Sequence, residues 1–408
     1  MQEPDIMLTD WALNKTTGQT VSVSADDLLN QHLLIVGQTR SGKSTSMVAL
    51  LMALQHKSQT AIILDPTGEY VNLPNVVVGQ LGGNAFLDYT ALTAPELAQL
   101  AGITDHEAIE TLGAAIVSLR IMKNVVRKQG LYVKMNRLWS DHEDALARLH
   151  AYPRPYNGAL LPEQLLAECV KPLAGAAANF DVIGQQPDFE KQTRLYPAVV
   201  KLRQWLSNPV YQRLLRLPMT DQMKKRLPKT RYDVGYLMRL FAAMKADHRH
   251  LVIDLSALAG DLRTGRLIVS LLAARLLRLK QTMRQSVPVV LTIDEAHRYL
   301  SQSTEMADDG LSRLAREGRK VGAYLMLTTQ SPLDLPQQLV GEFGQLMIHR
   351  LTTGAELALL LANPEVIAEI AQQKVGEATL AGTHFREPVP LKISPANVVH
   401  ETASPRFH

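Results

Sequence analysis

The sequence predicts an α/β fold, with a mostly parallel sheet flanked by helices and interrupted by an all-helical insertion. Short apolar runs that end in polar residues alternate with helical stretches before residue 90 and again after residue 250. This alternation is typical of a parallel sheet covered by helices. Between these regions the apolar spacing is helical. The 408 residues suffice for two or three domains, or for one large domain with an insertion.

We expect four segments: a short lead-in over 1–30, a core formed by 31–90 and 250–385, an insertion over 91–249, and an arm over 386–408. The lead-in ends in a small helix capped by Ser24. Core helices are predicted over 46–56 and 266–284. Core strands are predicted at 33–36, 61–64, 76–78, 251–254, 287–293, 323–330 and 346–351. The residues after 376 indicate edge strands or an extended arm.

Helix starts in the insertion are indicated by three capping boxes, Thr93 with Glu96, Thr104 with Glu107, and Ser140 with Glu143. One buried helical face is predicted from apolar residues at helical spacing. Its members are Ile109, Leu112, Ile116, Leu119 and Val126. Later in the insertion, the run KKRLPKTR at 224–231 is basic, and either a contact with a phosphate backbone or a solvated loop explains it.

The stretch LLIVGQTRSGKST at 33–45 has the order strand, loop, helix that a phosphate-binding loop requires. Glycines let backbone N–H groups close around phosphates, the lysine reaches the β- and γ-phosphate oxygens, and the hydroxyl is a ligand for Mg²⁺. The following helix points its positive dipole end at the anion. The predicted nucleotide-binding residues are Gly37, Arg40, Ser41, Gly42, Lys43, Ser44 and Thr45.

Polar residues at the ends of two later strands complete the predicted site. Asp294 follows an apolar strand and suits a magnesium partner, so the expected metal ligands are Ser44 and Asp294. Glu295 is positioned to deprotonate the attacking water. Gln330 ends another strand and suits a sensor of the γ-phosphate. Asp65 and Glu69 either add to this shell or cap a turn.

Hydrolysis in this class of site commonly uses an arginine from a neighbouring subunit. The stretch LSRLAREGRK at 311–320 offers three arginines, and Arg350 is a further candidate inside a predicted strand. A solvated helix face is the competing interpretation, and it is strongest for Arg313. We predict that Arg316 or Arg319 has this role.

Composition sets limits on the class of protein. The single cysteine, Cys169, excludes an intramolecular disulfide and suits a small buried residue in a reducing cytosol. The N-terminal residues lack the pattern of a signal peptide, and no stretch is apolar enough to span a membrane, so a soluble cytoplasmic protein is expected. A net charge of +4 favours polyanionic partners only weakly.

Several stretches together resemble the HerA group of the HerA/FtsK superfamily of ATPases. They are HLLIVGQTRSGKST, LDPTGEY, VIDLS, TIDEAHRYL, LAREGRKVGAYLMLTTQSP and VGEATLAG, in that order. The resemblance implies a RecA-like core assembled as a hexameric ring around double-stranded DNA, with ATP and Mg²⁺ bound between subunits. Lys43 and Ser44 match the Walker A positions, Asp294 and Glu295 the Walker B positions, and Gln330 the sensor position. It also implies a nuclease or other effector as partner.

Two departures from the family pattern bear on function. HerA proteins usually begin with a β-barrel, whereas only about 30 residues precede the loop here, so most of that barrel is expected to be missing. Arg40 stands where the family usually has glycine, and it either adds a phosphate contact or crowds the nucleotide.

The sequence therefore predicts an ATP-hydrolysing DNA translocase that acts in DNA end processing or anti-phage defence. One alternative is an ATP-gated ring scaffold that activates an effector without processive translocation. A superfamily-2 helicase is suggested by DEAH at 294–297, but roughly 250 residues separate Lys43 from Asp294, too many for one helicase lobe. A secretion or conjugation ATPase lacks a membrane anchor to support it.

Overall fold

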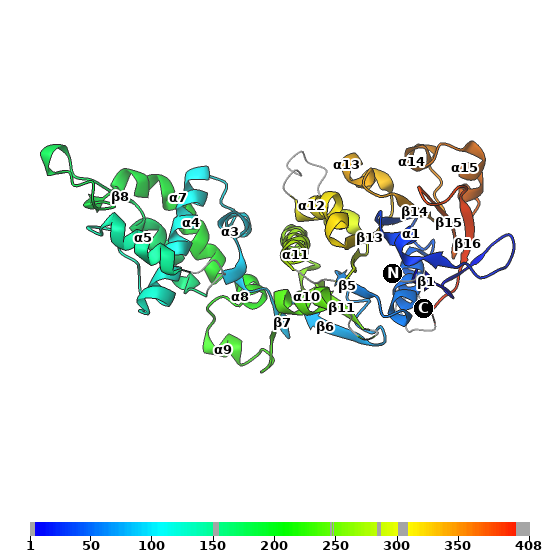
Figure 1. Ribbon diagram of the computed structural model, residues 1–408, viewed down its shortest axis with the longest axis horizontal. Coiled ribbons are helices and arrows are strands. Elements are labelled where there is room, and N and C mark those ends of the chain that lie inside the picture. Colours follow the sequence, from blue (N-terminus) through cyan, green and yellow to red (C-terminus); the bar gives the residue numbers. More distant parts are fainter. Residues whose placement is uncertain are drawn as a thin grey trace, which may run out of the picture. The chain divides into compact units, whose positions relative to one another are not determined.

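The computed structural model describes residues 5–149, 155–244, 247, 249–283, 287–300 and 309–396. Internal contacts divide the chain into two compact units (Figure 1). The α/β unit comprises residues 1–80 and 234–408, and the helical unit comprises residues 81–233. The predicted insertion at 91–249 overlaps the helical unit but has different limits. Residues 397–408 of the predicted C-terminal arm lie outside the described residues.

A ten-stranded sheet forms the α/β unit, in the order β2-β16-β15-β14-β4-β13-β12-β5-β11-β6. Neighbouring strands from β14 to β6 pair in parallel. The remaining pairs, β14 with β15, β15 with β16 and β16 with β2, are antiparallel. The bounds are β2 Ala12–Asn14, β4 Leu33–Val36, β5 Thr60–Asp65, β6 Val76–Gln80, β11 His250–Asp254, β12 Val289–Ile293, β13 Ala323–Thr329, β14 Gln345–Ile348, β15 Glu377–Gly382 and β16 Val389–Ile393. The predicted α/β class is confirmed.

Parallel pairing sets the position of the site. Val36 of β4 lies opposite Thr329 of β13, and Ile293 of β12 lies opposite Leu327 of β13. The carboxyl ends of these three strands therefore meet at one edge of the sheet. Ligands of open α/β sheets bind outside this edge.

Helices follow most of the parallel strands. Their bounds are α1 Ala25–Leu29, α2 Lys43–His56, α10 Val234–Ala243, α11 Leu262–Thr282, α12 Gly310–Glu317, α13 Gln337–Val340, α14 Gly354–Leu360 and α15 Pro364–Ala371. Ser24 caps α1 as predicted, because its side chain accepts from the N–H of Asp26. No helix among the described residues is long and apolar enough to cross a membrane.

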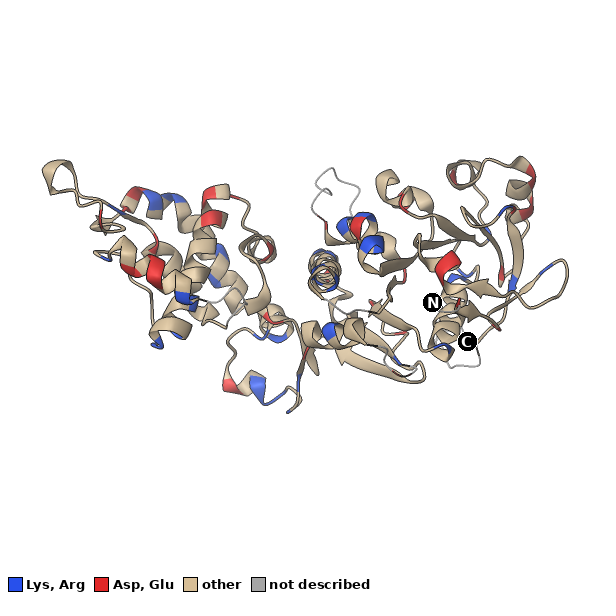
Figure 2. Cartoon of the chain, viewed as in Figure 1, with Lys and Arg blue, Asp and Glu red and all other residues tan. Residues whose placement is uncertain are grey.

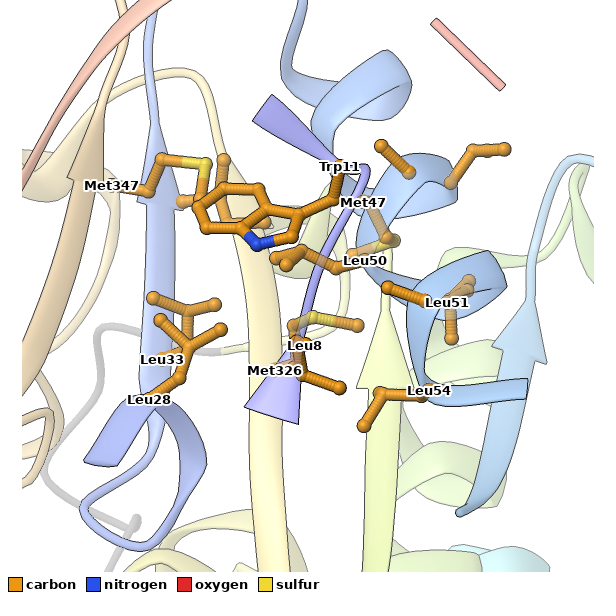
Figure 3. Close-up of a cluster of buried hydrophobic side chains, with 14 of the residues drawn as sticks. Leu8, Trp11, Leu28, Leu33, Met47, Leu50, Leu51, Leu54, Met326 and Met347 are labelled. Atoms are coloured by element: carbon orange, nitrogen blue, oxygen red, sulfur yellow. The ribbon is translucent and has the colours of Figure 1, made fainter. Parts of the chain in front are cut away.

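The N-terminal residues belong to the core of the α/β unit, although the sequence suggested a separate lead-in. β1 Met7–Leu8 pairs with β3 Val23–Ser24, and β2 pairs with β16 at the sheet edge. Trp11 is only 1% exposed. Figure 3 shows the cluster that buries it, with side chains from the N-terminal segment, α2 and the sheet. The labelled members are Leu8, Trp11, Leu28, Leu33, Met47, Leu50, Leu51, Leu54, Met326 and Met347.

The helical unit contains α3 Ala94–Ala101, α4 His106–Ile121, α5 Trp139–Arg148, α6 Leu161–Ala167, α7 Phe189–Ser207, α8 Pro209–Leu215 and α9 Asp221–Lys224. Two ladders of two-residue strands accompany them, so the unit is not purely helical. β7 Ala85–Phe86 pairs with β10 Tyr232–Asp233, and β8 Val170–Lys171 pairs with β9 Gln186–Pro187.

Local predictions in the helical unit had mixed outcomes. The capping box of Thr93 and Glu96 is present. The second box is wrong because Asp105, rather than Thr104, accepts from the N–H of Ala108 at 2.8 Å. The third is wrong because α5 begins at Trp139, whose N–H donates to the carbonyl of Asp181, and has no side-chain cap.

Three further expectations concern single residues of this unit. Val126 was predicted on the buried face of α4, but it lies in a π-helical turn at Met122–Val126 and is 39% exposed. Arg231, at the end of the basic run, donates to the carbonyls of Gly83 and Ala85. These two hydrogen bonds hold Arg231 to the segment around β7, and burial lowers the pKa of its guanidinium. Cys169 is buried and forms no disulfide, as expected, and burial raises the pKa of its thiol to about 11.

Candidate active site

The phosphate-binding loop connects β4 to α2 and is closely packed at its two glycines. A Cβ on Gly37 would lie 2.5 Å from Cβ of His349. Gly42 has φ 112°, and a Cβ there would lie 3.1 Å from the backbone nitrogen of Gly376. Other residues would be strained or would clash at both places. Arg40 is exposed and has φ 65°, a left-handed conformation unfavourable for a residue with a Cβ.

Lys43 and Ser44 are the first two residues of α2. Their side chains contact the phosphate loop and the residues that follow β12. Nζ of Lys43 donates to the carbonyl of Gln38 at 3.1 Å and lies 3.9 Å from Oε1 of Glu295. Oγ of Ser44 donates to Oδ2 of Asp294 at 3.0 Å. These contacts join the loop to the end of β12.

Asp294 is the centre of the hydrogen-bond network. Its Oδ2 accepts from the Tyr70 hydroxyl at 2.7 Å in addition to Ser44, and its Oδ1 accepts from the Thr328 hydroxyl. The N–H of Glu295 also donates to Oδ1, at 3.0 Å. Asp294 is 4% exposed, and the donors on both oxygens fix the orientation of the carboxylate.

Glu295 and Gln330 lie together at the same edge. Nε2 of Gln330 donates to Oε1 of Glu295 at 3.3 Å, and Oε1 of Gln330 accepts from the Thr39 hydroxyl at 3.0 Å. Glu295 has φ 51°, and its N–H donates to the Thr328 hydroxyl at 2.9 Å. The left-handed backbone costs about 1–3 kcal/mol, and such strain is frequent at functional sites. Nδ1 of His297 lies 3.3 Å from Oε2 of Glu295.

Burial and like charges shape the titration of this region. Burial lowers the pKa of Lys43, and the carboxylates of Glu295 and Asp294 oppose that shift. Burial also raises the pKa of Glu69, with added repulsion from Asp294, Asp65 and Glu295. The pKa of Tyr70 is raised well above its ordinary value by burial and by Asp294. The Tyr70 hydroxyl therefore stays protonated near pH 7 and can donate to Asp294.

Asp65 has a local structural role in this conformation. Its Oδ1 accepts from the N–H groups of Thr67, Gly68 and Glu69, and its Oδ2 accepts from the N–H of Tyr70 at 2.8 Å. The carboxylate therefore caps the turn after β5. Of the two interpretations of Asp65, turn capping has the direct contacts.

The predicted arginines are separate from this network. Arg316 and Arg319 are exposed in α12 and the turn after it, before β13 begins. Nε2 of His32, directly before β4, pairs with the carbonyl of Ala315 at 2.8 Å, and Arg319 contributes to lowering the pKa of His32. These contacts lie at the amino ends of β4 and β13, opposite the phosphate loop. Figure 2 shows basic and acidic residues close together along α12. Nε of Arg313 lies 3.9 Å from Oε1 of Glu317.

Arg350 has a different position from the one predicted. β14 ends at Ile348, so Arg350 lies outside the strand, and its carbonyl accepts from the N–H of Gln38 at 3.0 Å. It is exposed beside the phosphate loop of its own chain.

Four side chains of the site had no predicted role. Tyr70 and Thr328 orient Asp294, Thr39 orients Gln330, and His349 lies beneath the loop with Nε2 2.8 Å from Oγ of Ser46. Burial lowers the pKa of His349 to about 4, so it is neutral near pH 7. Tyr70, Thr39 and Thr328 lie within the stretches that carry the family resemblance, whereas His349 lies outside them.

The donor set at this edge suits Mg²⁺ with a nucleoside triphosphate. Ser44 and Asp294 offer hard oxygen ligands beside a lysine and a glycine-rich loop. Among the described residues no cluster of three or more His, Cys, Asp or Glu forms an all-protein metal site. Mg²⁺ typically needs only one or two protein ligands, because it keeps waters and binds substrate phosphates.

The sequence is similar to known proteins over most of its length. The family described as "Helicase HerA, central domain" matches residues 12–145. The probable DNA double-strand break repair helicase HerA of Methanocaldococcus jannaschii is 22% identical, with 91% of this chain and 73% of that protein covered. HerA of Pyrococcus furiosus is 21% identical, with 91% and 67% covered.

Solved structures share the fold. VirB4 of Thermoanaerobacter pseudethanolicus aligns with a TM-score of 0.61 at 14% identity, covering 97% of this chain and 98% of that one. The plasmid coupling protein TrwB in complex with ADP and Mg²⁺ aligns with a TM-score of 0.55 at 13% identity, covering 98% of each chain.

The sheet and the loop at its edge define a RecA-like phosphate-loop protein of the ATPase class. Within that class, the sequence is similar to HerA proteins, in agreement with the resemblance seen in its motifs, and the HerA central-domain family matches residues 12–145.

Proposed function

We propose that this chain is the subunit of an ATP-hydrolysing double-stranded DNA translocase. The contact between Ser44 and Asp294 carries the proposal, because it unites the two halves of a magnesium nucleotide site. The HerA relatives are described as DNA double-strand break repair helicases, and TrwB as a plasmid coupling protein. We extend the proposal to a hexamer that acts with a nuclease or other effector in DNA end processing or anti-phage defence.

Binding of ATP is assigned to the loop and to α2. Backbone N–H groups of the loop and Lys43 hold the phosphates, and Ser44 and Asp294 hold Mg²⁺. Mg²⁺ held by Ser44 and Asp294 would supply charge neutralisation for the phosphates. Nζ of Lys43 lies 3.9 Å from Glu295 and must turn toward the phosphates when ATP enters.

Hydrolysis is assigned to Glu295 and Gln330. Glu295 accepts the proton of the attacking water, and Gln330, bonded to Glu295 at 3.3 Å, orients the water and responds to the γ-phosphate. Arg316 or Arg319 of a neighbouring subunit stabilises the transition-state charge. Both arginines are exposed and lie away from the site of their own chain, as a residue acting in trans requires.

A ring scaffold that organises an effector without translocation is the second candidate. Arg40 favours it, because this residue has the strained φ of 65° where the family usually has glycine. In that case ATP binding holds the assembly together and turnover is slow.

Displacement of a triplex-forming oligonucleotide from linear duplex DNA separates the two candidates. A translocase removes the third strand in an ATP-dependent reaction, and Glu295→Gln abolishes removal while the assembly persists. A scaffold leaves the third strand in place under the same conditions, with or without the substitution. Lys43→Ala is the control for dependence on ATP binding.

A further inference from the structure

An exposed apolar residue lies at the mouth of the phosphate site. Val375 is 78% exposed, the most exposed large hydrophobic side chain among the described residues. Isolated exposed apolar residues are common, so exposure alone assigns no role. Val375 differs from such residues because its neighbour Gly376 contacts the phosphate loop.

The turn that carries Val375 is fixed on the phosphate loop. The N–H of Glu377 donates to the carbonyl of Lys374 at 3.0 Å, and Gly376 has φ 81°, which suits the third position of a type II turn. The N–H of Gly376 donates to the carbonyl of Ser41 at 3.1 Å. Val375 therefore lies one residue from a direct contact with the loop.

Further bonds hold the turn in place. The carboxylate of Glu377 accepts from Nζ of Lys15 at 2.7 Å and from the N–H of Lys374 at 2.9 Å. The carbonyl of Gly376 accepts from the N–H of Ile393 at 2.8 Å. A turn held in this way keeps an apolar side chain in solvent without allowing it to fold back onto the core.

The order of the strands places Val375 on the nucleoside side of the loop. β4 lies between β13 and β14, and the groups assigned to the γ-phosphate and water follow β12 and β13. β15 is antiparallel to β14, so its first residue, Glu377, lies at the edge where β4 ends. A triphosphate with its γ end toward Glu295 extends its nucleoside toward β14 and β15.

We propose that Val375 packs against the base of the bound nucleotide and contributes to the preference for a nucleoside triphosphate over bare polyphosphate. An exposed valine on a fixed turn can pack against the apolar face of a purine ring. This inference rests on the proposed ATP site and adds the residue that contacts the base.

The test compares two ligands that differ in the nucleoside. Calorimetric titration of the full chain with a non-hydrolysable ATP analogue and with inorganic tripolyphosphate, both with Mg²⁺, gives two dissociation constants. Val375→Ser is expected to raise the dissociation constant of the ATP analogue about three- to tenfold, because the substitution removes roughly one buried apolar contact. Tripolyphosphate binding is expected to stay within twofold of wild type.

Control variants separate this role from a structural one. Val375→Ile is expected to retain wild-type affinity for both ligands. Val133→Ser, at a valine 53% exposed in the helical unit, is expected to change neither constant. The proposal would be overturned if Val375→Ser weakened the binding of both ligands equally, or if it did not weaken binding of the analogue. Lys43→Ala is expected to abolish binding of both ligands if the phosphate site is correctly assigned. A failure of the proposed ATP site can therefore be distinguished from a failure of the proposed base contact.

Discussion

Oγ of Ser44 donates a 3.0 Å hydrogen bond to Oδ2 of Asp294, across 250 positions of sequence. This contact joins the first turn of α2 to the end of β12 and brings both proposed magnesium ligands together. Tyr70 donates to the same oxygen, so the orientation of Asp294 depends on a residue from a third segment.

Tyr70→Phe tests this orientation. The variant removes the 2.7 Å bond to Asp294, and the Mg²⁺ concentration for half-maximal hydrolysis is expected to rise about tenfold. The measurement is a magnesium titration at saturating ATP. Tyr236→Phe, at a tyrosine 56% exposed, is the matched control. An unchanged magnesium requirement in Tyr70→Phe would show that Tyr70 does not position Asp294 for the metal.

Arg40→Gly tests the departure in the loop. We expect the KM for ATP to rise roughly three- to tenfold, because a cation beside the phosphates is lost. Arg40→Lys keeps the charge and is expected to restore most of the affinity. Faster turnover of Arg40→Gly at an unchanged KM would contradict this expectation and indicate that Arg40 crowds the nucleotide.

Mixing two inactive variants tests the arginine in trans. Arg319→Ala has an intact loop without the arginine, and Lys43→Ala has the arginine without a working loop. If the arginine serves a neighbouring subunit, an equimolar mixture regains activity at roughly a quarter of its interfaces. The same mixture with Arg316→Ala identifies which arginine acts. Arg313→Ala is the control, and an inactive mixture for both Arg316 and Arg319 would contradict the assignment.

The stability of the α/β unit is expected to fall with acid. His250 is fully buried, its Nε2 pairs with the carbonyl of Leu51 at 2.8 Å, and burial lowers its pKa to about 4. The unfolded chain therefore binds more protons than the folded chain below about pH 6.5, and stability decreases as pH falls toward 4. Between pH 7 and 5 this residue accounts for about 2 kcal/mol of the loss.

Denaturant unfolding at pH 7 and pH 5 measures this effect. His250→Gln is expected to be less stable at pH 7 and to show a smaller change between the two pH values. His56→Gln, at an exposed histidine, is expected to keep the wild-type dependence. An equal dependence in His250→Gln and wild type would show that His250 is not the source.

Sequence reasoning identified the groups whose residue types and order carry chemistry. Lys43, Ser44, Asp294, Glu295 and Gln330 each follow a strand or begin a helix, and parallel pairing brings such ends together. The alternation of apolar runs and helices likewise predicted the sheet. The proposed roles of these residues await the variants described above.

Other contacts depend on geometry that local patterns do not encode. The pairing of β2 with β16 and the bond from Gly376 to Ser41 join distant segments, and no spacing signals either one. Thr328 has no sequence feature that distinguishes it from other threonines in strands, and only the fold shows that its hydroxyl donates to Asp294. The start of α5 was predicted wrongly because a bond to Asp181, rather than a serine cap, sets its first turn.

The most direct test of the translocase is ATP hydrolysis by the purified protein, with and without linear duplex DNA, on a sample whose native mass is recorded. We expect a hexamer whose hydrolysis is stimulated by DNA and is lost in Lys43→Ala. A protein that remains monomeric with ATP and DNA, or whose hydrolysis persists in Lys43→Ala, would contradict this expectation.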